Sequence, residues 1–296
     1  MKSQAMIEHF FLEERQHIEA RLKSIVETLT GPQSLLDAID YSLQAGGKRI
    51  RPILLLATLQ GLNKPLQLGY DVACAIEMIH TYSLVHDDLP AMDDDDLRRG
   101  KPTNHKVFGE ALAILAGDGL LTHSFNIISR LEDISDATKI QLLQRISEAA
   151  GPSGMVAGQV ADMEGEGKIL SLDELEQIHH RKTGDLLGVS LECGAILGSA
   201  SMETIAELSA FGKHIGLAFQ IKDDVLDVEG DEESIGKPVG SDAESDKNTY
   251  PSILGLEEAK EKLDYHIDAA KSHLSNLPYE FGLLEEIADF IKNRTA

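Results

Sequence analysis

Cationic side chains are scarce in this sequence of 296 residues. It has 27 Lys and Arg against 50 Asp and Glu, which gives a formal net charge of −23. A protein that holds phosphodiester backbones needs a basic face, and this charge repels polyanions at long range. Nucleic-acid binding is therefore excluded as a general function, while 42% apolar and 26% charged residues are typical of a soluble globular protein.

Cysteines and long apolar runs are scarce as well. The only two cysteines, Cys74 and Cys193, lie in apolar surroundings without CxxC spacing, so we expect buried thiols and neither a disulfide nor a zinc site. Nowhere do 18 apolar residues run together, and the first residues lack a basic region followed by an apolar stretch. We therefore expect neither a membrane span nor a secretory signal, and a cytoplasmic location.

Only nine prolines punctuate the chain, and no convincing alternating strand is present. Apolar residues recur at spacings of three and four, as in the stripes Leu68–Ser83 and Ile205–Leu226, which predicts helices. The same pattern predicts helices near 4–29, 33–45, 51–61, 109–131, 136–150, 172–199, 254–276 and 279–294. We predict an all-α fold, a bundle of long helices, formed as a single domain over residues 1–296.

The most unusual segment is DDLPAMDDDD, with six aspartates between Asp87 and Asp96. It follows an apolar helical run, so its first carboxylates lie at the end of a largely buried helix, where the dipole also disfavours anions. Pro90 stops that helix and lets the chain turn back, so that Asp87 and Asp93 converge. The alternative, a solvated acidic loop, does not explain why carboxylates follow a buried helix.

A second cluster, DDVLD, closes another amphipathic helix. Asp223 and Asp227 are four residues apart and share one helix face, while Asp224 points about 100° away. Alone this motif is weak, but two such clusters indicate carboxylates that face each other across a cavity. Oxygen ligands without histidine or cysteine favour Mg²⁺, which is typically shared with substrate phosphates.

The basic residues gather beside these clusters or in glycine-rich turns. Arginine and lysine near exposed backbone amides suit phosphate oxygens, although any one group could be an ordinary helix-end cation. The groups are GGKRIRP (46–52), Arg98-Arg99 with Lys101, Arg181-Lys182, Lys237 and Lys247. One further segment, Glu229–Tyr250, is polar and glycine-containing, and we predict a lid over the bound phosphates, with a simple linker as the alternative.

These motifs resemble the trans-prenyl diphosphate synthase family, and within it the bacterial enzymes that make farnesyl diphosphate, over almost the whole chain. The matching segments are GGKRIRP (46–52), HTYSLVHDDLPAMDDDDLRRGKPT (80–103), GQVADM (158–163), KTG (182–184), GLAFQIKDDVLD (216–227), GKPVGSD (236–242) and DKNTYP (246–251). The resemblance implies a homodimer of helical bundles, each with a deep cavity whose mouth carries both aspartate motifs.

The resemblance also implies roles for individual residues. Three Mg²⁺ ions, with Mn²⁺ as an alternative, would bind at Asp87, Asp88, Asp93, Asp223 and Asp227. The allylic diphosphate would be held by Arg98, Lys182 and Lys237, with Thr183, Gln220 and Lys247 beside it. Isopentenyl diphosphate would be held by Lys48, Arg51, His80 and Arg99, and Gln159 and Asp162 would line the cavity. Asp246 departs from the glycine that many members of the family carry here, and it adds a negative charge beside Lys247.

The implied reaction condenses isopentenyl diphosphate with dimethylallyl and geranyl diphosphate to give farnesyl diphosphate. Asp87, Asp88, Asp93, Lys182 and Asp223 would be the catalytic residues. Tyr82 precedes Asp87 by five residues, about 7–8 Å down the same helix at ~1.5 Å per residue. With Ser83 it predicts a cavity floor that stops the product at fifteen carbons, unless Tyr82 only packs against a neighbour.

Other functions fit the sequence less well. A geranylgeranyl diphosphate synthase would share the first aspartate motif. A terpene cyclase would carry a second motif with Asn, Ser and Glu in place of DDVLD, and would not need GGKRIRP. A non-catalytic synthase subunit would have lost aspartates or lysines. A metallohydrolase built on His86-Asp87 would need further spaced histidines, which we do not find.

Overall fold

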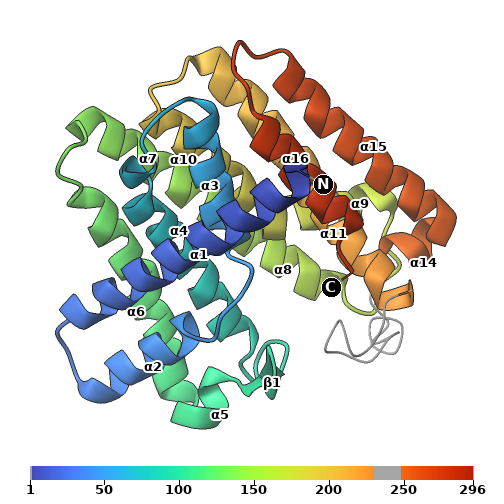
Figure 1. Ribbon diagram of the computed structural model, residues 1–296. Helices are drawn as coiled ribbons and strands as arrows, with labels where there is room; N and C mark the ends of the chain where they lie inside the picture. The colour runs from blue at the N-terminus through green and yellow to red at the C-terminus, as the bar shows by residue number, and fades with distance from the viewer. Residues whose placement is uncertain (1, 230–247, 296) are drawn as a thin grey trace.

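The computed structural model describes residues 2–229 and 248–295. Helices dominate it, as predicted, and pack around a central helix (Figure 1). The first half of the chain forms α1 (Lys2–Thr28), α2 (Gln33–Leu43), α3 (Ile50–Gly61), the 3-10 turn η1 (Leu66–Leu68), α4 (Tyr70–Asp87), α5 (Asn104–Phe108), α6 (Glu110–Ser129) and α7 (Asp136–Ala150). The second half forms α8 (Met155–Gly165), α9 (Leu172–His179), η2 (His180–Gly184), α10 (Asp185–Leu197), α11 (Met202–Glu229), α14 (Tyr250–Leu254), α15 (Leu256–Ser275) and α16 (Gly282–Asn293).

The central helix is α10, which is buried at every residue from Leu186 to Leu197. An apolar circumference of this kind is expected of a helix with others on all sides. Two apolar clusters fill the interior. One lies among α1, α2, α4, α6 and α7, the other lies among α11, α15 and α16, and α3 and α10 contribute residues to both.

Close glycine contacts bring η2 and α10 against α11. A Cβ on Gly216 would lie 2.6 Å from Cα of Gly184, and one on Gly212 would lie 2.7 Å from Cα of Gly188. Since real Cβ atoms do not approach that closely, the absent side chains let the two backbones touch. This contact sets the distance between the segment that carries Lys182 and the helix that carries Asp223.

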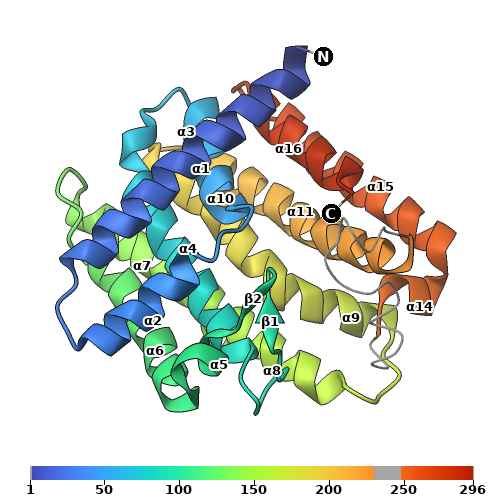
Figure 2. The same ribbon diagram turned by 60° about the horizontal axis from the view of Figure 1, so that its bottom comes forward.

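Some boundaries differ from the prediction. A small antiparallel ladder, β1 (Leu97–Arg98) with β2 (Lys101–Pro102), was not expected from the sequence. Arg99 and Gly100 link the two strands with φ of 55° and 73°, the sign that tight hairpin turns require (Figure 2). The predicted helix 254–276 is interrupted at Gly255 (φ 85°), where α14 ends and α15 begins.

Cys74 and Cys193 are buried free thiols, as predicted. The predicted lid, Glu229–Tyr250, falls almost entirely outside the described residues, together with Lys237, Lys247 and Asp246. One described helix, α6, is long and apolar enough to cross a membrane by length and composition, and 33% of its most apolar window is buried.

Candidate active site

The first aspartate motif turns back on itself directly after α4. The helix ends at Asp87, and the backbone N–H of Asp93 donates a 2.9 Å hydrogen bond to the carbonyl oxygen of Asp87. The predicted convergence of these two residues is therefore present. Asp88 is only 3% exposed and accepts hydrogen bonds from Nε and NH2 of Arg98, at 2.8 and 2.6 Å.

The environment of these carboxyls disfavours their charge. Burial raises the pKa of Asp87 to about 6; Lys182 opposes this shift and Asp93 adds to it. Burial also raises the pKa of Asp88, against the hydrogen bonds from Arg98. Buried carboxyls with raised pKa values need a cationic partner to stay ionised, which is what a bound metal ion would supply.

The second motif lies at the end of α11. The carboxylate of Asp223 accepts a 2.5 Å hydrogen bond from Arg294. Asp224 turns away, as the helix geometry predicted, and accepts a 2.9 Å hydrogen bond from the backbone N–H of Tyr250. Tyr250 is fully buried and stacks on His179, so the start of α14 is anchored beside the second motif.

Lys182 and Thr183 join the two motifs. They lie in η2, a single π-helical turn between α9 and α10, and such turns are frequent at functional sites. Lys182 donates a 2.6 Å hydrogen bond to Asp162 of α8, and Thr183 donates one of 2.6 Å to Gln220 of α11. Asp162, Asp87 and Asp93 raise the pKa of Lys182, although burial opposes the shift. Lys182 is therefore fixed as a cation between both clusters.

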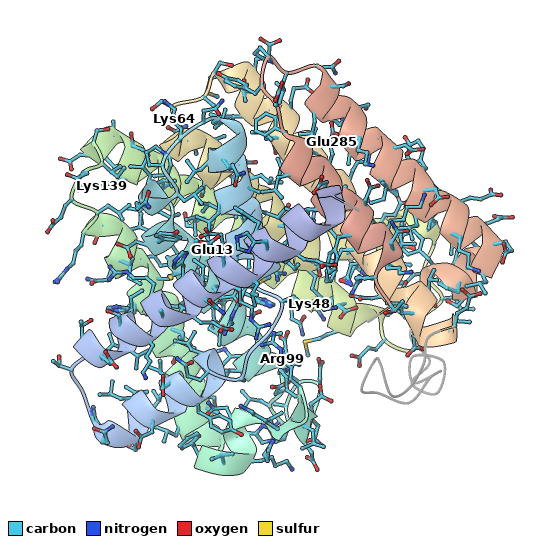
Figure 3. All side chains as sticks on the ribbon, viewed as in Figure 1. Glu13, Lys48, Lys64, Arg99, Lys139 and Glu285 are labelled. Carbon is cyan, nitrogen blue, oxygen red and sulfur yellow. The ribbon has the colours of Figure 1, made fainter. Side chains whose placement is uncertain are left out.

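A cationic cavity of about 430 Å³ adjoins this turn. Burial lowers the pKa of Arg51 to about 10, and Arg99 adds to that shift. Burial together with Arg51 and Arg99 lowers the pKa of His80 well below its usual value. Figure 3 labels Lys48 and Arg99, whose segments adjoin where Gly47 lies against the Arg99 guanidinium. All four residues predicted for isopentenyl diphosphate line this cavity: Lys48, Arg51, His80 and Arg99.

The GGKRIRP turn faces the cavity because Arg49 points inward. Arg49 adopts the left-handed conformation (φ 52°) just before α3. Its guanidinium is buried, donates a 2.7 Å hydrogen bond to Glu77, and donates one of 2.6 Å to the carbonyl oxygen of Leu43. This buried pair anchors the turn. Lys48 and Arg51, on either side, are then left to line the cavity.

An apolar cavity of about 400 Å³ extends from the other side of Lys182 and Thr183. Tyr82 and Ser83 of α4 line it, and Met155, Val156, Val160 and Met163 of α8 form the opposite wall. Tyr82 is 7% exposed, so its ring lies in the wall and not in solvent. In the described part of the chain, Gln159 Nε2 and Arg51 Nε are buried without a hydrogen-bond partner, and both residues line this cavity.

An acidic cavity of about 210 Å³ completes the site. Asp93, Asp162 and Asp223 line it together with Lys182 and Gln220. Within residues 2–229 and 248–295, no three carboxylate, histidine or cysteine side chains lie close enough to enclose a metal by themselves. Mg²⁺ is commonly held by one or two carboxylates together with waters and substrate phosphates. The donor set therefore fits a metal that binds jointly with a diphosphate.

Two contributors escaped the sequence analysis. Arg294 reaches Asp223 from the far end of the chain, and its guanidinium lies 4.2 Å from the centre of the Phe219 ring. No local motif marks it. Arg49 stands inside the recognised GGKRIRP segment, but its burial against Glu77 depends on a contact 28 residues away.

Three adjoining cavities, one cationic, one apolar and one acidic, meet in this helical protein, an arrangement that suits a substrate with a phosphate group and an apolar chain. A model of the polyprenyl synthetase family matches residues 32–280. The chain belongs to this family and is a prenyltransferase, so the predicted all-α fold and family are confirmed.

Named relatives extend over nearly the whole chain. It is 56% identical to a farnesyl diphosphate synthase of Geobacillus stearothermophilus, over 99% of each protein. It is 54% identical to that of Bacillus subtilis strain 168, over 96% of this chain and 97% of the other. The crystal structure of geranylgeranyl pyrophosphate synthetase from Pyrococcus horikoshii Ot3 superposes with a TM-score of 0.89 at 33% identity, covering 99% of this chain and 100% of the other.

Proposed function

We propose that the protein makes (2E,6E)-farnesyl diphosphate by two successive head-to-tail condensations. Isopentenyl diphosphate is added first to dimethylallyl diphosphate and then to the geranyl diphosphate so formed, with one diphosphate released each time. Both relatives described above at 54–56% identity carry the name of this activity, which supports the predicted product. Residues 1–296 act as a single domain in this proposal.

One observation carries the proposal: the three cavities meet at Lys182 and Thr183. Lys182 borders the acidic and apolar cavities, and Thr183 borders the apolar and cationic ones. An allylic diphosphate fits with its phosphates at the acidic cavity and its chain in the apolar one. Isopentenyl diphosphate then lies in the cationic cavity. This arrangement brings the reacting carbons of both substrates to the shared boundary.

The carboxylates suit Mg²⁺, or Mn²⁺ in its place. Asp87, Asp88 and Asp93 would hold two ions on one side of the allylic diphosphate, and Asp223 with Asp227 a third on the other. When bound, these ions draw electrons from the diphosphate and make it a better leaving group. Metal binding would compete with the contacts that Arg98 and Arg294 make with Asp88 and Asp223, and the Arg98 guanidinium, once released, would be available to phosphate oxygens.

The side chains stabilise the charges that develop. As the allylic carbon–oxygen bond breaks, the diphosphate takes the electron pair, and Lys182 and Arg98 neutralise its added charge, with Lys237 and Lys247 assigned the same task. The isopentenyl double bond attacks the allylic cation, and a proton then leaves the new cation for the released diphosphate. The apolar walls of α4 and α8 keep water from quenching either cation.

The wall of the apolar cavity sets the product length in this proposal. Tyr82 stands between the aspartates and the interior, with Ser83 next to it, so a growing chain meets the ring after fifteen carbons. A geranylgeranyl product is the second candidate, because the synthetase from Pyrococcus horikoshii Ot3 shares the fold.

We further propose a homodimer formed through α6. Ile114 and Leu115 are 43% and 55% exposed on a helix whose mean hydropathy reaches 1.4. An apolar helix with an open face is stabilised when a second copy covers it. The cytoplasmic location expected from the sequence stays a prediction.

The test is incubation with labelled isopentenyl diphosphate, dimethylallyl diphosphate and Mg²⁺, followed by dephosphorylation and separation by chain length. Incorporation that disappears with EDTA, with farnesol as the end product, supports the proposal. Incorporation that ends in geranylgeraniol overturns the product length only. A cyclase would give no labelled product here but would release a cyclic hydrocarbon from added geranyl or farnesyl diphosphate, and no turnover of either kind indicates a non-catalytic subunit.

A further inference from the structure

His86, one residue before the first aspartate motif, inserts into a notch in α6. The notch exists because residue 117 is a glycine. A Cβ built on Gly117 would lie 2.2 Å from Nε2 and 2.5 Å from Cδ2 of the His86 ring. Real Cβ atoms do not make such contacts, so the present position of His86 is incompatible with any side chain at 117.

Two further contacts hold the ring in place. His86 Nε2 lies 3.0 Å from the carbonyl oxygen of Ile114 on α6, so it carries the proton and donates it there. The ring also meets Tyr82, one helical turn earlier on α4, in an edge-to-face contact with centroids 5.7 Å apart. His86 and Tyr82 both line the 400 Å³ apolar cavity.

From this geometry we propose that Gly117 is a positioning residue for product length. By leaving the notch open, it keeps the His86 ring against α6 and out of the space that the growing prenyl chain needs. This inference rests on the proposed function and assigns a residue that touches neither substrate nor metal. Gly117 acts only through His86.

The direction of the effect follows from what surrounds the ring. With the notch filled by a methyl group, the His86 ring can no longer lie against α6, and the apolar cavity that His86 already lines is the space into which it can turn. The displaced ring then takes room from the cavity, and a geranyl chain, which fills more of that cavity than a dimethylallyl chain, loses more. A single methylene of misfit in an apolar pocket changes kcat/KM by about 10–200-fold. We expect Gly117→Ala to lower the ratio of kcat/KM for geranyl over dimethylallyl diphosphate by about tenfold or more.

The experiment compares four variants: Gly117→Ala, His86→Ala, the double variant and Gly119→Ala. Product lengths and both kcat/KM values are measured for each one. Gly119→Ala is the matched control, since it adds the same methyl group to the same helix and meets only the terminal methyl of Ile39, at 3.2 Å. A general effect of alanine on α6 would therefore appear in both single glycine variants.

We expect geranyl diphosphate to accumulate with Gly117→Ala and farnesyl diphosphate to remain the product of Gly119→Ala. His86→Ala enlarges the cavity and adds geranylgeranyl diphosphate to the products. The double variant should match His86→Ala, with farnesyl diphosphate restored and geranylgeranyl diphosphate added, because the ring that the new methyl group displaces is gone.

Three results overturn the inference. They are an unchanged substrate ratio in Gly117→Ala, the same loss in Gly119→Ala, and a double variant no better than Gly117→Ala. If Gly117→Ala does not fold, the product length of His86→Ala still tests the inference. An unchanged product length in His86→Ala contradicts the role assigned to the His86 ring. A wild-type protein that makes no farnesyl diphosphate refutes the proposed function instead, so the two failures are distinguishable.

Discussion

Arg294 and Asp223 form an ion pair of 2.5 Å between NH2 and Oδ1 that ties the end of the chain to the second aspartate motif. The side chain of Arg294 is 4% exposed and that of Asp223 is 41% exposed. Asp223 is also the carboxylate that we assign to a metal ion. If Asp223 binds a metal ion as proposed, Arg294 would compete with that ion for the carboxylate.

Replacing this arginine should make metal binding easier. In Arg294→Gln we expect the Mg²⁺ concentration for half-maximal activity to fall about two- to fivefold, since partly exposed ion pairs contribute about 0.2–1 kcal/mol. The measurement is a Mg²⁺ titration of initial rates at saturating substrates. Arg21→Gln removes a comparable ion pair with Asp71, away from the site, and should leave the titration unchanged. A higher Mg²⁺ requirement in Arg294→Gln contradicts the competition.

Removing the aromatic ring at the cavity wall should lengthen the product. In Tyr82→Ala we expect geranylgeranyl diphosphate to reach amounts comparable to farnesyl diphosphate, because the fifteen-carbon chain no longer meets the ring. Tyr82→Phe keeps the ring and should keep the product. Chromatography of the dephosphorylated products measures both. If Tyr82→Ala still stops at farnesyl diphosphate, the floor lies elsewhere.

A charge on the open face of α6 should separate the protomers. We expect Leu115→Glu to sediment as a monomer at concentrations where the wild type is a dimer, since the carboxylate would be buried without a partner. Ile169→Glu, at a loop position that is 99% exposed, is the control and should remain dimeric. Wild-type protein that sediments as a monomer rules out the proposed dimer.

A buried histidine pair far from the aspartates should destabilise the fold in acid. His266 lies with its Nδ1 2.9 Å from Nδ1 of His214. Burial lowers the pKa of His266 to about 4, and His214 and Lys262 add to that shift. In the unfolded chain the pKa of a histidine is near 6.5. Between pH 6.5 and about 4 the unfolded state therefore binds a proton at His266 that the folded state does not bind, and this favours unfolding. The stability contributed by neutral His266 is full above pH 6.5 and is lost as the pH falls toward 4.

His266→Asn removes this penalty. Relative to wild type, its free energy of unfolding should improve by about 1–2 kcal/mol on going from pH 7.5 to pH 5, as denaturant titrations at both values would show. His9→Asn alters a histidine whose side chain is 76% exposed and should follow the wild type at both values. A difference between His266→Asn and wild type that stays constant with pH contradicts the assignment.

Local patterns predicted much of the site. Pro90 and the apolar run before it gave the end of α4 and the return of Asp93, because both depend on residues close in sequence. The spacing of Asp223, Asp224 and Asp227 predicted that Asp224 points away from the other two. This is confirmed, because Asp224 turns to the backbone of Tyr250. Periodicity also placed most helices, with ends shifted by a few residues where glycine or proline capping decides the boundary.

Features that depend on distant contacts were not predictable. The segment 172–199 reads as one helix, but packing of η2 against Gly158 of α8, where a Cβ would lie 2.2 Å from the backbone N of Lys182, accompanies a π-helical turn there. Arg294 and the pairing of Arg49 with Glu77 join segments far apart in the chain. Such contacts follow from the tertiary arrangement, which periodicity does not encode.

The most direct test of the account is the longest product that the wild-type protein makes in a long incubation with dimethylallyl diphosphate, Mg²⁺ and excess labelled isopentenyl diphosphate. The three adjoining cavities and the Tyr82 wall predict label in farnesol and none beyond fifteen carbons. Label that moves on into geranylgeraniol as isopentenyl diphosphate is consumed would contradict the proposed floor, and absence of label from every prenyl alcohol would contradict the proposed reaction.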